Sequence, residues 1–197
     1  MDSRGMRAIG LGIGIGLWAC GAAAGEPLRL GVIGGVGRFS VADPEGPTAA
    51  AAAPDLAVVA VLGWGRDTRL RLAAGRESVT LAASTADIGQ RVERTSASLS
   101  YQERWRLSYR WKPWLGIGLG YAREDETLRH TIDSGGFLAT AYPDRTIGVP
   151  DAVLTADSEW RWTHGWKIGV DLRYDAPLDP HAATVLAAGA LLTHRLR

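Results

Sequence analysis

The chain of 197 residues has little of what metal sites, redox centres and thiol catalysts require. It contains one cysteine, Cys20, which lies in an N-terminal segment that we expect to be removed. Without a further cysteine, no disulfide framework, cysteine-based metal site or thiol nucleophile can form. The four histidines show no metal-ligand spacing such as H-x-x-x-H. We therefore expect no cofactor and no metal site.

An excess of charge of one sign is also missing, because 22 basic and 21 acidic residues leave a formal net charge of +1. The composition thus gives no electrostatic reason to expect a nucleic-acid partner. Gly34, Gly35 and Gly37 do not form a phosphate-binding loop, since no Lys-Ser or Lys-Thr follows and no helix begins there.

Long hydrophobic runs are absent after residue 24, so no later segment is expected to cross a membrane as a helix. At the N-terminus, Arg4 and Arg7 precede an apolar stretch over residues 8–19, which is typical of an export signal. The small residues at 22–24 supply a cleavage pattern.

This pattern predicts a signal peptide over residues 1–24 and one mature domain over residues 25–197. Two alternatives stay open. Cys20 follows Leu17-Trp18-Ala19, which resembles a lipoprotein box, so lipidation at Cys20 would compete with cleavage after Ala24. The segment could also be retained as an anchor helix.

The segment from Ser96 to Trp111 alternates polar and apolar residues with the period of a β-strand. Its apolar face ends in aromatic side chains, at Trp105, Tyr109 and Trp111. A long strand with one polar face, one apolar face and an aromatic band at one end is typical of an outer-membrane β-barrel.

Eight segments show strand character and alternate along most of their length. They cover residues 28–40, 56–65, 69–81, 96–111, 115–124, 152–162, 166–175 and 184–196. The third changes parity between Leu72 and Val79, which predicts either a bulge near Gly75 or a strand that rises above the membrane.

The connections alternate between short turns and longer loops, as in outer-membrane barrels. Short turns are expected at residues 66–68, 112–113 and 163–165, and the longest loop at residues 125–151. Most tryptophans lie near the short turns, where a membrane-interface girdle is expected: Trp64, Trp105, Trp111, Trp114, Trp160, Trp162 and Trp166. An exported N-terminus would place these turns in the periplasm and the 125–151 loop outside the cell.

The polar faces of the predicted strands carry charges of both signs. Nine residues are expected to form a structural charge network inside the barrel: Arg104, Arg106, Arg110, Asp157, Glu159, Arg161, Lys167, Asp171 and Arg173. Because an eight-stranded barrel is just wide enough to be filled by side chains, we interpret this network as a plug. A narrow polar channel or a proton path is the alternative.

Catalytic residues are not expected. An enzyme that modifies lipids at the membrane interface would need a nucleophile beside a base. Ser158 lies on the outward face without a neighbouring base, and His130 and Ser134 share only a loop.

The segment from Arg106 through Trp111, Pro113 and Trp114 to Tyr121 has the composition of a barrel hairpin. Together with the strand count and loop asymmetry, the region 28–196 resembles the small eight-stranded outer-membrane β-barrel proteins, typified by OmpX, the membrane domain of OmpA and, less closely, OmpW. The resemblance is architectural and transfers no functional residue. It implies a surface protein that serves adhesion, envelope integrity or small-solute passage.

The sequence therefore predicts an all-β fold, an eight-stranded antiparallel up-and-down transmembrane β-barrel in the outer membrane of a Gram-negative cell. The expected role is structural or surface-interacting, without enzymatic activity. The expected partners are outer-membrane lipid and lipopolysaccharide, the outer-membrane assembly machinery, and a surface partner at the 125–151 loop. The alternatives are a small-solute pore, a lipid-modifying barrel enzyme and a soluble periplasmic barrel.

Overall fold

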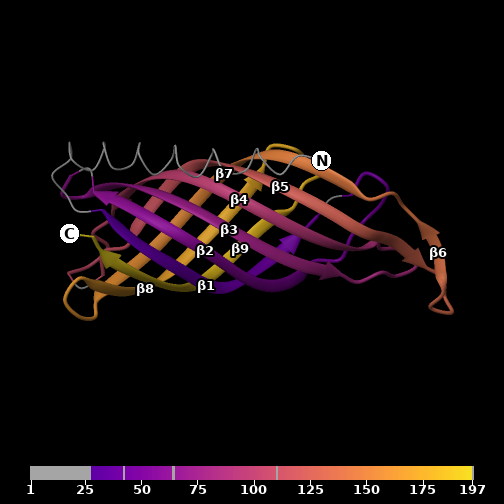
Figure 1. Cartoon of the computed structure of the whole chain (residues 1–197), viewed down its shortest axis with the longest axis horizontal. Coiled ribbons are helices and arrows are strands. Elements are labelled where there is room, and N and C mark those ends of the chain that lie inside the picture. Colours follow the sequence, from indigo (N-terminus) through magenta and orange to yellow (C-terminus); the bar gives the residue numbers. More distant parts are fainter. Residues whose placement is uncertain (1–27, 42, 64, 110, 197) are drawn as a thin grey trace.

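A computed structural model describes residues 28–41, 43–63, 65–109 and 111–196. The predicted signal peptide lies outside these residues, and so does Arg110. The described part is all-β (Figure 1) and has nine strands: β1 (Arg29–Ser40), β2 (Ala51–Gly63), β3 (Thr68–Leu81), β4 (Gly89–Arg104), β5 (Trp114–Ile132), β6 (Leu138–Ala141), β7 (Arg145–Arg161), β8 (Trp166–Pro177) and β9 (Thr184–Arg195). It contains no helix that is long and apolar enough to cross a membrane.

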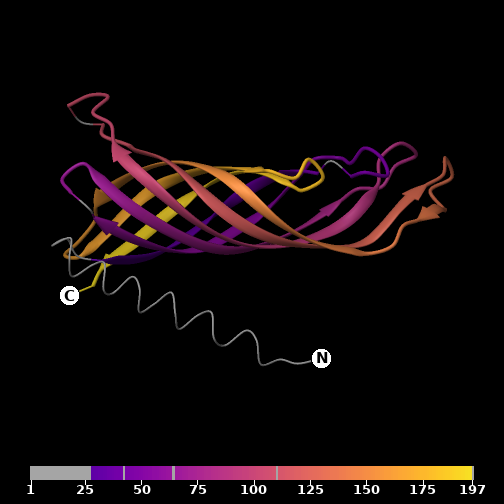
Figure 2. The same ribbon diagram turned by 90° about the horizontal axis from the view of Figure 1, so that it is seen from above.

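Eight of the strands close into an antiparallel barrel. The ring runs β1-β2-β3-β4-β5-β7-β8-β9, and β9 pairs with β1 to complete it. The short β6 pairs only with the far end of β5, so it stands outside the ring and projects from one end of the barrel (Figures 1 and 2). The predicted eight-stranded up-and-down barrel is confirmed as the fold.

The two ends of the barrel differ. We call the end where β1 begins and β9 ends the turn end; it also holds the connections 64–67, 105–113 and 162–165. We call the opposite end the loop end; it holds residues 41–50, 82–88, 133–144 and 178–183, and the β6 hairpin. Figure 2 shows that hairpin extending past the rest of the barrel.

Side chains alternate between the outer wall and the lumen along most of each of the eight barrel strands, as the sequence predicts. The outer wall carries an apolar belt that includes Val32, Val36, Leu56, Val58, Leu99, Ile117, Leu119, Leu154, Val170, Leu172 and Leu186, each at least half exposed. A soluble barrel would bury these side chains, because exposed apolar surface of this extent is unfavourable in water. The belt has the character of a lipid-facing surface.

Several boundaries differ from the sequence prediction. β4 ends at Arg104, not at Trp111, so the connection after it spans residues 105–113 and is not a tight turn. β5 runs eight residues beyond Glu124, to Ile132. Much of the predicted 125–151 loop is therefore strand, in which backbone groups pair with neighbouring strands, and only its central part is a loop.

β3 needs no bulge near Gly75, because its pairing with β4 is continuous from Thr68 to Leu81. Arg76 therefore points outward, and its side chain is 72% exposed. Val79 and Leu81 point inward instead and join an apolar cluster of the lumen near the loop end, together with Phe39, Val41, Ala53, Val92, Ala183, Val185 and Ala187. The inward-facing residues of β3 are polar near the turn end and apolar near the loop end. This change along one face produces the shift in alternation seen in the sequence.

Candidate functional site

The lumen near the turn end is filled by a network centred on Arg69 of β3. Its guanidinium donates to Gln102 Oε1 at 2.7 Å and to Glu159 Oε2 at 3.0 Å, and it also pairs with Asp157. Gln102 in turn donates to Asp157 Oδ2 at 2.8 Å. The ring of Trp114 lies 4.1 Å from the Arg69 guanidinium carbon and covers this network.

One level deeper, Arg71 of β3 forms an ion pair with Asp171 of β8 at 2.7 Å and with Asp157 at 3.5 Å. In a ring of eight strands, β3 and β8 stand diametrically opposite each other. The Arg71–Asp171 pair therefore crosses the full width of the lumen. Both side chains are almost fully buried, so each charge depends on the other for its solvation.

The next level holds two arginines among five carboxylates. Arg94 of β4 is fully buried and lies within 4 Å of four of them: Glu77, Glu124, Asp151 and Asp175. It also donates to the carbonyl of Ala183 at 2.9 Å. Arg173 of β8 pairs with Asp55 at 3.2 Å and with Glu77 of the opposite strand β3. Acid groups outnumber guanidinium groups here.

The loop end of the lumen is closed by Arg129 of β5. A register shift opposite Gly89–Arg91 places an extra residue in β5, and Leu128 there adopts a positive φ of 56°. The bulge moves Leu128 outward and turns Arg129 inward, where it donates to both Asp43 oxygens at 2.8 Å. Arg145 supports this closure by donating to Glu126 at 2.7 and 2.9 Å.

Among the residues expected in the charge network, five lie in the lumen and make ion pairs: Asp157, Glu159, Lys167, Asp171 and Arg173. Three do not. Arg104 and Arg161 are exposed at the turn end, and Arg106 pairs with Asp67 at the surface. These three differ from the prediction because β4 and β7 end at Arg104 and Arg161, so strand alternation no longer directs side chains inward beyond those points.

Sequence reasoning missed more than half of the network, including Asp55, Arg69, Arg71, Glu77, Arg94, Glu124 and Asp151. Arg69 and Arg71 could have been found, because they alternate with Leu70 and Leu72 on a segment already assigned as a strand. Arg94 was missed because its segment was assigned to a loop, although the alternation of β4 continues up to Val92 and Gln90.

The predicted aromatic girdle is present at the turn end, where Trp105, Trp111, Trp160, Trp162 and Trp166 are exposed. Trp114 differs, since it faces the lumen over Arg69. Trp64 lies outside the described residues. The Trp111 indole donates to the Ser158 hydroxyl at 2.9 Å, which satisfies a polar group on the outer wall.

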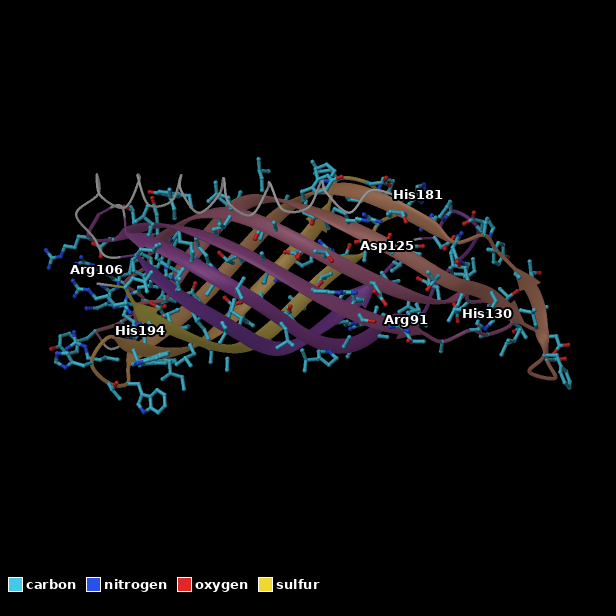
Figure 3. The ribbon with its side chains drawn as sticks, in the orientation of Figure 1. Arg91, Arg106, Asp125, His130, His181 and His194 are labelled. Atoms are coloured by element: carbon cyan, nitrogen blue, oxygen red, sulfur yellow. The ribbon has the colours of Figure 1, made fainter. Side chains whose placement is uncertain are left out.

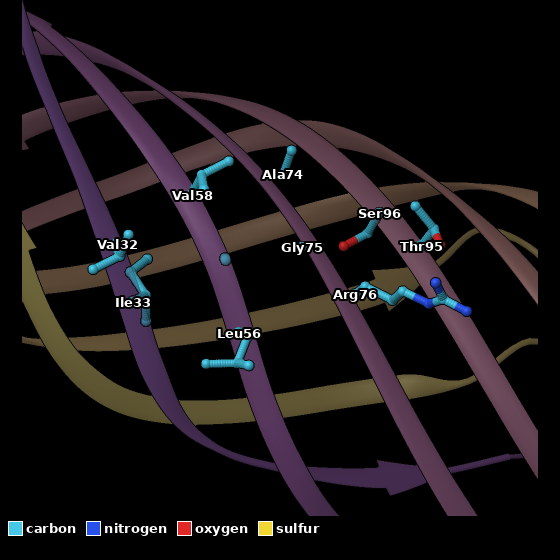
Figure 4. Close-up of a pocket in the computed structure, with 10 residues that line it drawn as sticks. Val32, Ile33, Leu56, Val58, Ala74, Gly75, Arg76, Thr95 and Ser96 are labelled. Atoms are coloured by element: carbon cyan, nitrogen blue, oxygen red, sulfur yellow. The ribbon is translucent and has the colours of Figure 1, made fainter. Parts of the chain in front are cut away.

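The outer wall also has a shallow depression across β1 to β4, with a volume of about 430 Å³ (Figure 4). Val32, Leu56 and Val58 line it on one side, and Ala74 and Gly75 leave its floor open. The side chain of Arg76 stands at its edge, paired with Glu93 at 2.8 Å. The depression belongs to the apolar belt and has room for lipid chains.

The described residues offer no catalytic or metal constellation that can be assigned. They contain no group of three or more His, Asp or Glu side chains arranged to hold a metal ion. The Nδ1 atom of His130 lies 2.6 Å from the carbonyl oxygen of Leu128, two positions earlier in the chain, and no hydrogen bond joins it to a described serine. His164 and His194 line one hollow at the turn end, whereas His130 and His181 lie at the loop end (Figure 3).

No protein-family model and no curated protein matches this chain. Solved structures do match in fold. Neisserial surface protein A aligns with a TM-score of 0.58 at 12% identity, over 86% of this chain and 97% of that one. The outer membrane protein OprG from Pseudomonas aeruginosa aligns with a TM-score of 0.56 at 10% identity, over 87% and 96%. Ail, the attachment invasion locus protein of Yersinia pestis, aligns with a TM-score of 0.52 at 9% identity, over 87% and 100%.

These likenesses establish the fold class. The chain has the fold of the small outer-membrane β-barrel proteins, and its apolar belt is the outer surface that such a fold presents to lipid. At identities of 9–12% no functional residue can be transferred from them.

Proposed function

We propose that the protein is an outer-membrane β-barrel with a sealed lumen that acts at the cell surface through its loop end. Export would remove residues 1–24, and the barrel would be inserted by the outer-membrane assembly machinery. The apolar belt and the aromatic side chains at the turn end support contact with outer-membrane lipid, including lipopolysaccharide on the outer side.

The main support for this proposal is that ion pairs between opposite strands cross the lumen. Arg71 and Asp171 join β3 to β8 at 2.7 Å, and Arg173 joins β8 back to Glu77 of β3. Side chains that span the full width of an eight-stranded barrel leave no continuous water path between its ends. The lumen is then a structural core and not a conduit.

A conductance measurement tests the sealed lumen. The purified protein in planar lipid bilayers should give no steady channels, and the double variant Arg71→Ala/Asp171→Ala should also stay closed, because the Arg173–Glu77 crossing and the Arg129 closure remain. Steady, ion-selective channels from the unmodified protein would contradict the sealed lumen and favour a small-solute pore.

The β5–β6 hairpin supports a surface role. β6 pairs with β5 at His130–Ile132, and exposed apolar side chains lie where the turn leads into β6, with Phe137 73% and Leu138 65% exposed. Beneath it lies a cavity of about 500 Å³, lined in part by Arg129, His130 and Tyr142. Apolar side chains held out on a rigid hairpin are suited to contact another molecule.

The charge of the loop end narrows the class of partner. Ail has been crystallised with sucrose octasulfate, a heparin analogue. The loop-end connections of this chain carry no lysine or arginine, and Asp43 and Glu45 are paired with Arg129. The acids that remain for a partner are Asp87, Asp133, Asp144 and Asp179. A neutral or basic partner is therefore favoured over a sulfated polysaccharide.

An adhesion assay tests the hairpin. Cells that display the double variant Phe137→Ser/Leu138→Ser should adhere to surfaces or host cells less than cells with the unmodified protein, at equal display levels. Leu186→Ser, on the outer wall away from the hairpin, is the control for a general loss of apolar surface. Equal adhesion by the hairpin variant and the unmodified protein would remove the hairpin from the proposal.

A further inference from the structure

Two pairs of like-charged residues stand directly opposite each other at the turn end. Arg29 of β1 is the cross-strand partner of Arg195 of β9, and Arg161 of β7 is the partner of Lys167 of β8. The four cations thus lie on β7, β8, β9 and β1, which are neighbours around the barrel. Like charges in directly opposite positions destabilise a sheet, so an anion held between them would stabilise the barrel.

The four cations line one cavity, which we call the turn-end cavity. Its volume is about 130 Å³, and the turn after β7 completes its wall with Thr163, His164, Gly165 and Trp166. Because a water molecule occupies about 30 Å³ in the liquid, the cavity has room for a phosphate-sized anion. No carboxylate is among the described residues that line it.

The nearest carboxylate is already engaged on the lumen side. Glu159 accepts from Lys167 at 3.1 Å and from Arg69 at 3.0 Å through the same oxygen, Oε2. Its other oxygen lies 3.4 Å from the Thr193 hydroxyl. Within the described part of the chain, Arg161 and Arg195 form no ion pair with a carboxylate, so they remain available to a ligand.

The turn-end cavity lies within a wider excess of positive charge. The turn end carries Arg29, Arg66, Arg104, Arg106, Lys112, Arg161, Lys167 and Arg195, against Asp67, Glu103 and Glu159 among the described residues there. At the loop end, the acids of the connections are balanced in part by Arg91, Arg129 and Arg145 of the adjoining strands. Figure 3 shows Arg106 and His194 at the turn end, with Asp125 toward the other end. The chain is nearly neutral overall, but the turn end carries an excess of positive charge.

We propose that the turn-end cavity binds a phosphate-bearing anion between Arg29, Arg161, Lys167 and Arg195. Guanidinium groups bind phosphate oxygens through paired N–H donors, and lysine adds a compact positive charge. The phosphate can belong to an anionic phospholipid headgroup of the adjoining leaflet or to a soluble phosphate compound. This site goes beyond the proposed surface role, because it lies at the opposite end of the barrel and does not depend on the hairpin.

A stability measurement with inorganic pyrophosphate tests the soluble source. Protein folded in a nonionic detergent should unfold at a temperature a few degrees higher when pyrophosphate is added than when sodium chloride of equal ionic strength is added. The double variant Arg161→Gln/Arg195→Gln should lose this shift. Arg123→Gln, which removes an exposed arginine from β5 far from the cavity, should keep it.

Nanodiscs test the lipid source. If a headgroup occupies the cavity, discs containing phosphatidylglycerol should raise the unfolding temperature above that in phosphatidylcholine discs, and pyrophosphate should add nothing further. The double variant should show no difference between the two discs. If the source is soluble, the two discs should give equal temperatures and pyrophosphate should raise both.

Two results would overturn the proposal: no shift with either probe, or an equal shift in the unmodified protein and the double variant. The two substituted side chains are exposed at strand ends, so the variant should fold. If it does not, the single variants Arg161→Gln and Arg195→Gln replace it, and Arg195→Lys, which keeps the charge, should retain most of the shift.

Discussion

The guanidinium of Arg129 donates to both carboxylate oxygens of Asp43 at 2.8 Å and so ties β5 to the loop between β1 and β2. The two residues are 86 positions apart in the chain. Arg129 also donates to the carbonyl of Pro143 at 2.7 Å, which fixes the far side of the β6 hairpin. One buried cation therefore closes the lumen and sets the position of the hairpin at the same time.

Arg129→Met should loosen the loop end. Removal of one partner of a buried ion pair leaves the Asp43 carboxylate without its bidentate partner, at a cost of about 3 kcal/mol. The urea midpoint should fall, and hydrogen exchange should increase in residues 43–50. Arg123→Met removes an exposed arginine of the same strand and should change the midpoint little. Equal effects of the two substitutions would show that the Arg129 contacts contribute nothing specific.

The Arg129–Asp43 pair also predicts that the stability of the barrel depends on pH. Burial raises the pKa of the Asp43 carboxyl, but hydrogen bonds with Glu45 and Arg129 outweigh burial and hold the pKa below its usual 3.8. A lowered pKa in the folded state contributes stability that is present above pH 3.8 and is lost as the pH falls through the folded value. The amide of Glu45 donates to Asp43 at 3.0 Å, so its NMR shift reports this titration. A midpoint above 3.8 would contradict the assignment.

The surplus of acid around Arg94 predicts opposite effects for charge-removing substitutions. Arg94→Gln should strongly destabilise the barrel, because it leaves four buried carboxylates without their shared cation. Glu124→Gln should leave stability unchanged or raise it, since it removes one negative charge while its amide oxygen can still accept from the Ala183 amide. Urea unfolding monitored by tryptophan fluorescence compares the two. A similar loss of stability in both variants would contradict a surplus of acidic groups around Arg94.

Val170 tests the lipid-facing wall. It is 53% exposed on β8, between the inward-facing Gly169 and Asp171. Val170→Arg should impair membrane assembly, because arginine at the midplane of a barrel wall costs roughly 2–4 kcal/mol. Val170→Met keeps the position apolar and should assemble normally. The amount of folded protein in the membrane fraction compares the two variants. Normal assembly of Val170→Arg would contradict the assignment of the apolar belt as a lipid-facing surface.

Orientation can be tested by labelling cysteines in living cells. If the loop end faces outward, Ser134→Cys in the β6 hairpin should react with a membrane-impermeant maleimide in intact cells. Ser108→Cys, in the turn-end connection, should react only after the cells are opened. The reverse pattern would invert the topology. The native Cys20 does not interfere if residues 1–24 are removed. Mass spectrometry of the labelled protein checks whether they have been removed.

Alternation along the chain was sufficient to predict which residues of β1, β5 and β8 face lipid, because the side-chain period of a strand is a local property of the backbone. The eight-stranded count and the apolar belt follow from this local signal. The pairings inside the lumen do not, since Arg71 meets Asp171 only when the ring closes and brings opposite strands face to face. The inward turn of Arg129 depends on a bulge at Leu128, whose backbone conformation no sequence period marks. The closure of the ring and the register of its strands are set by contacts between distant strands. They determine which charged residues meet in the lumen and how both ends of the barrel are built.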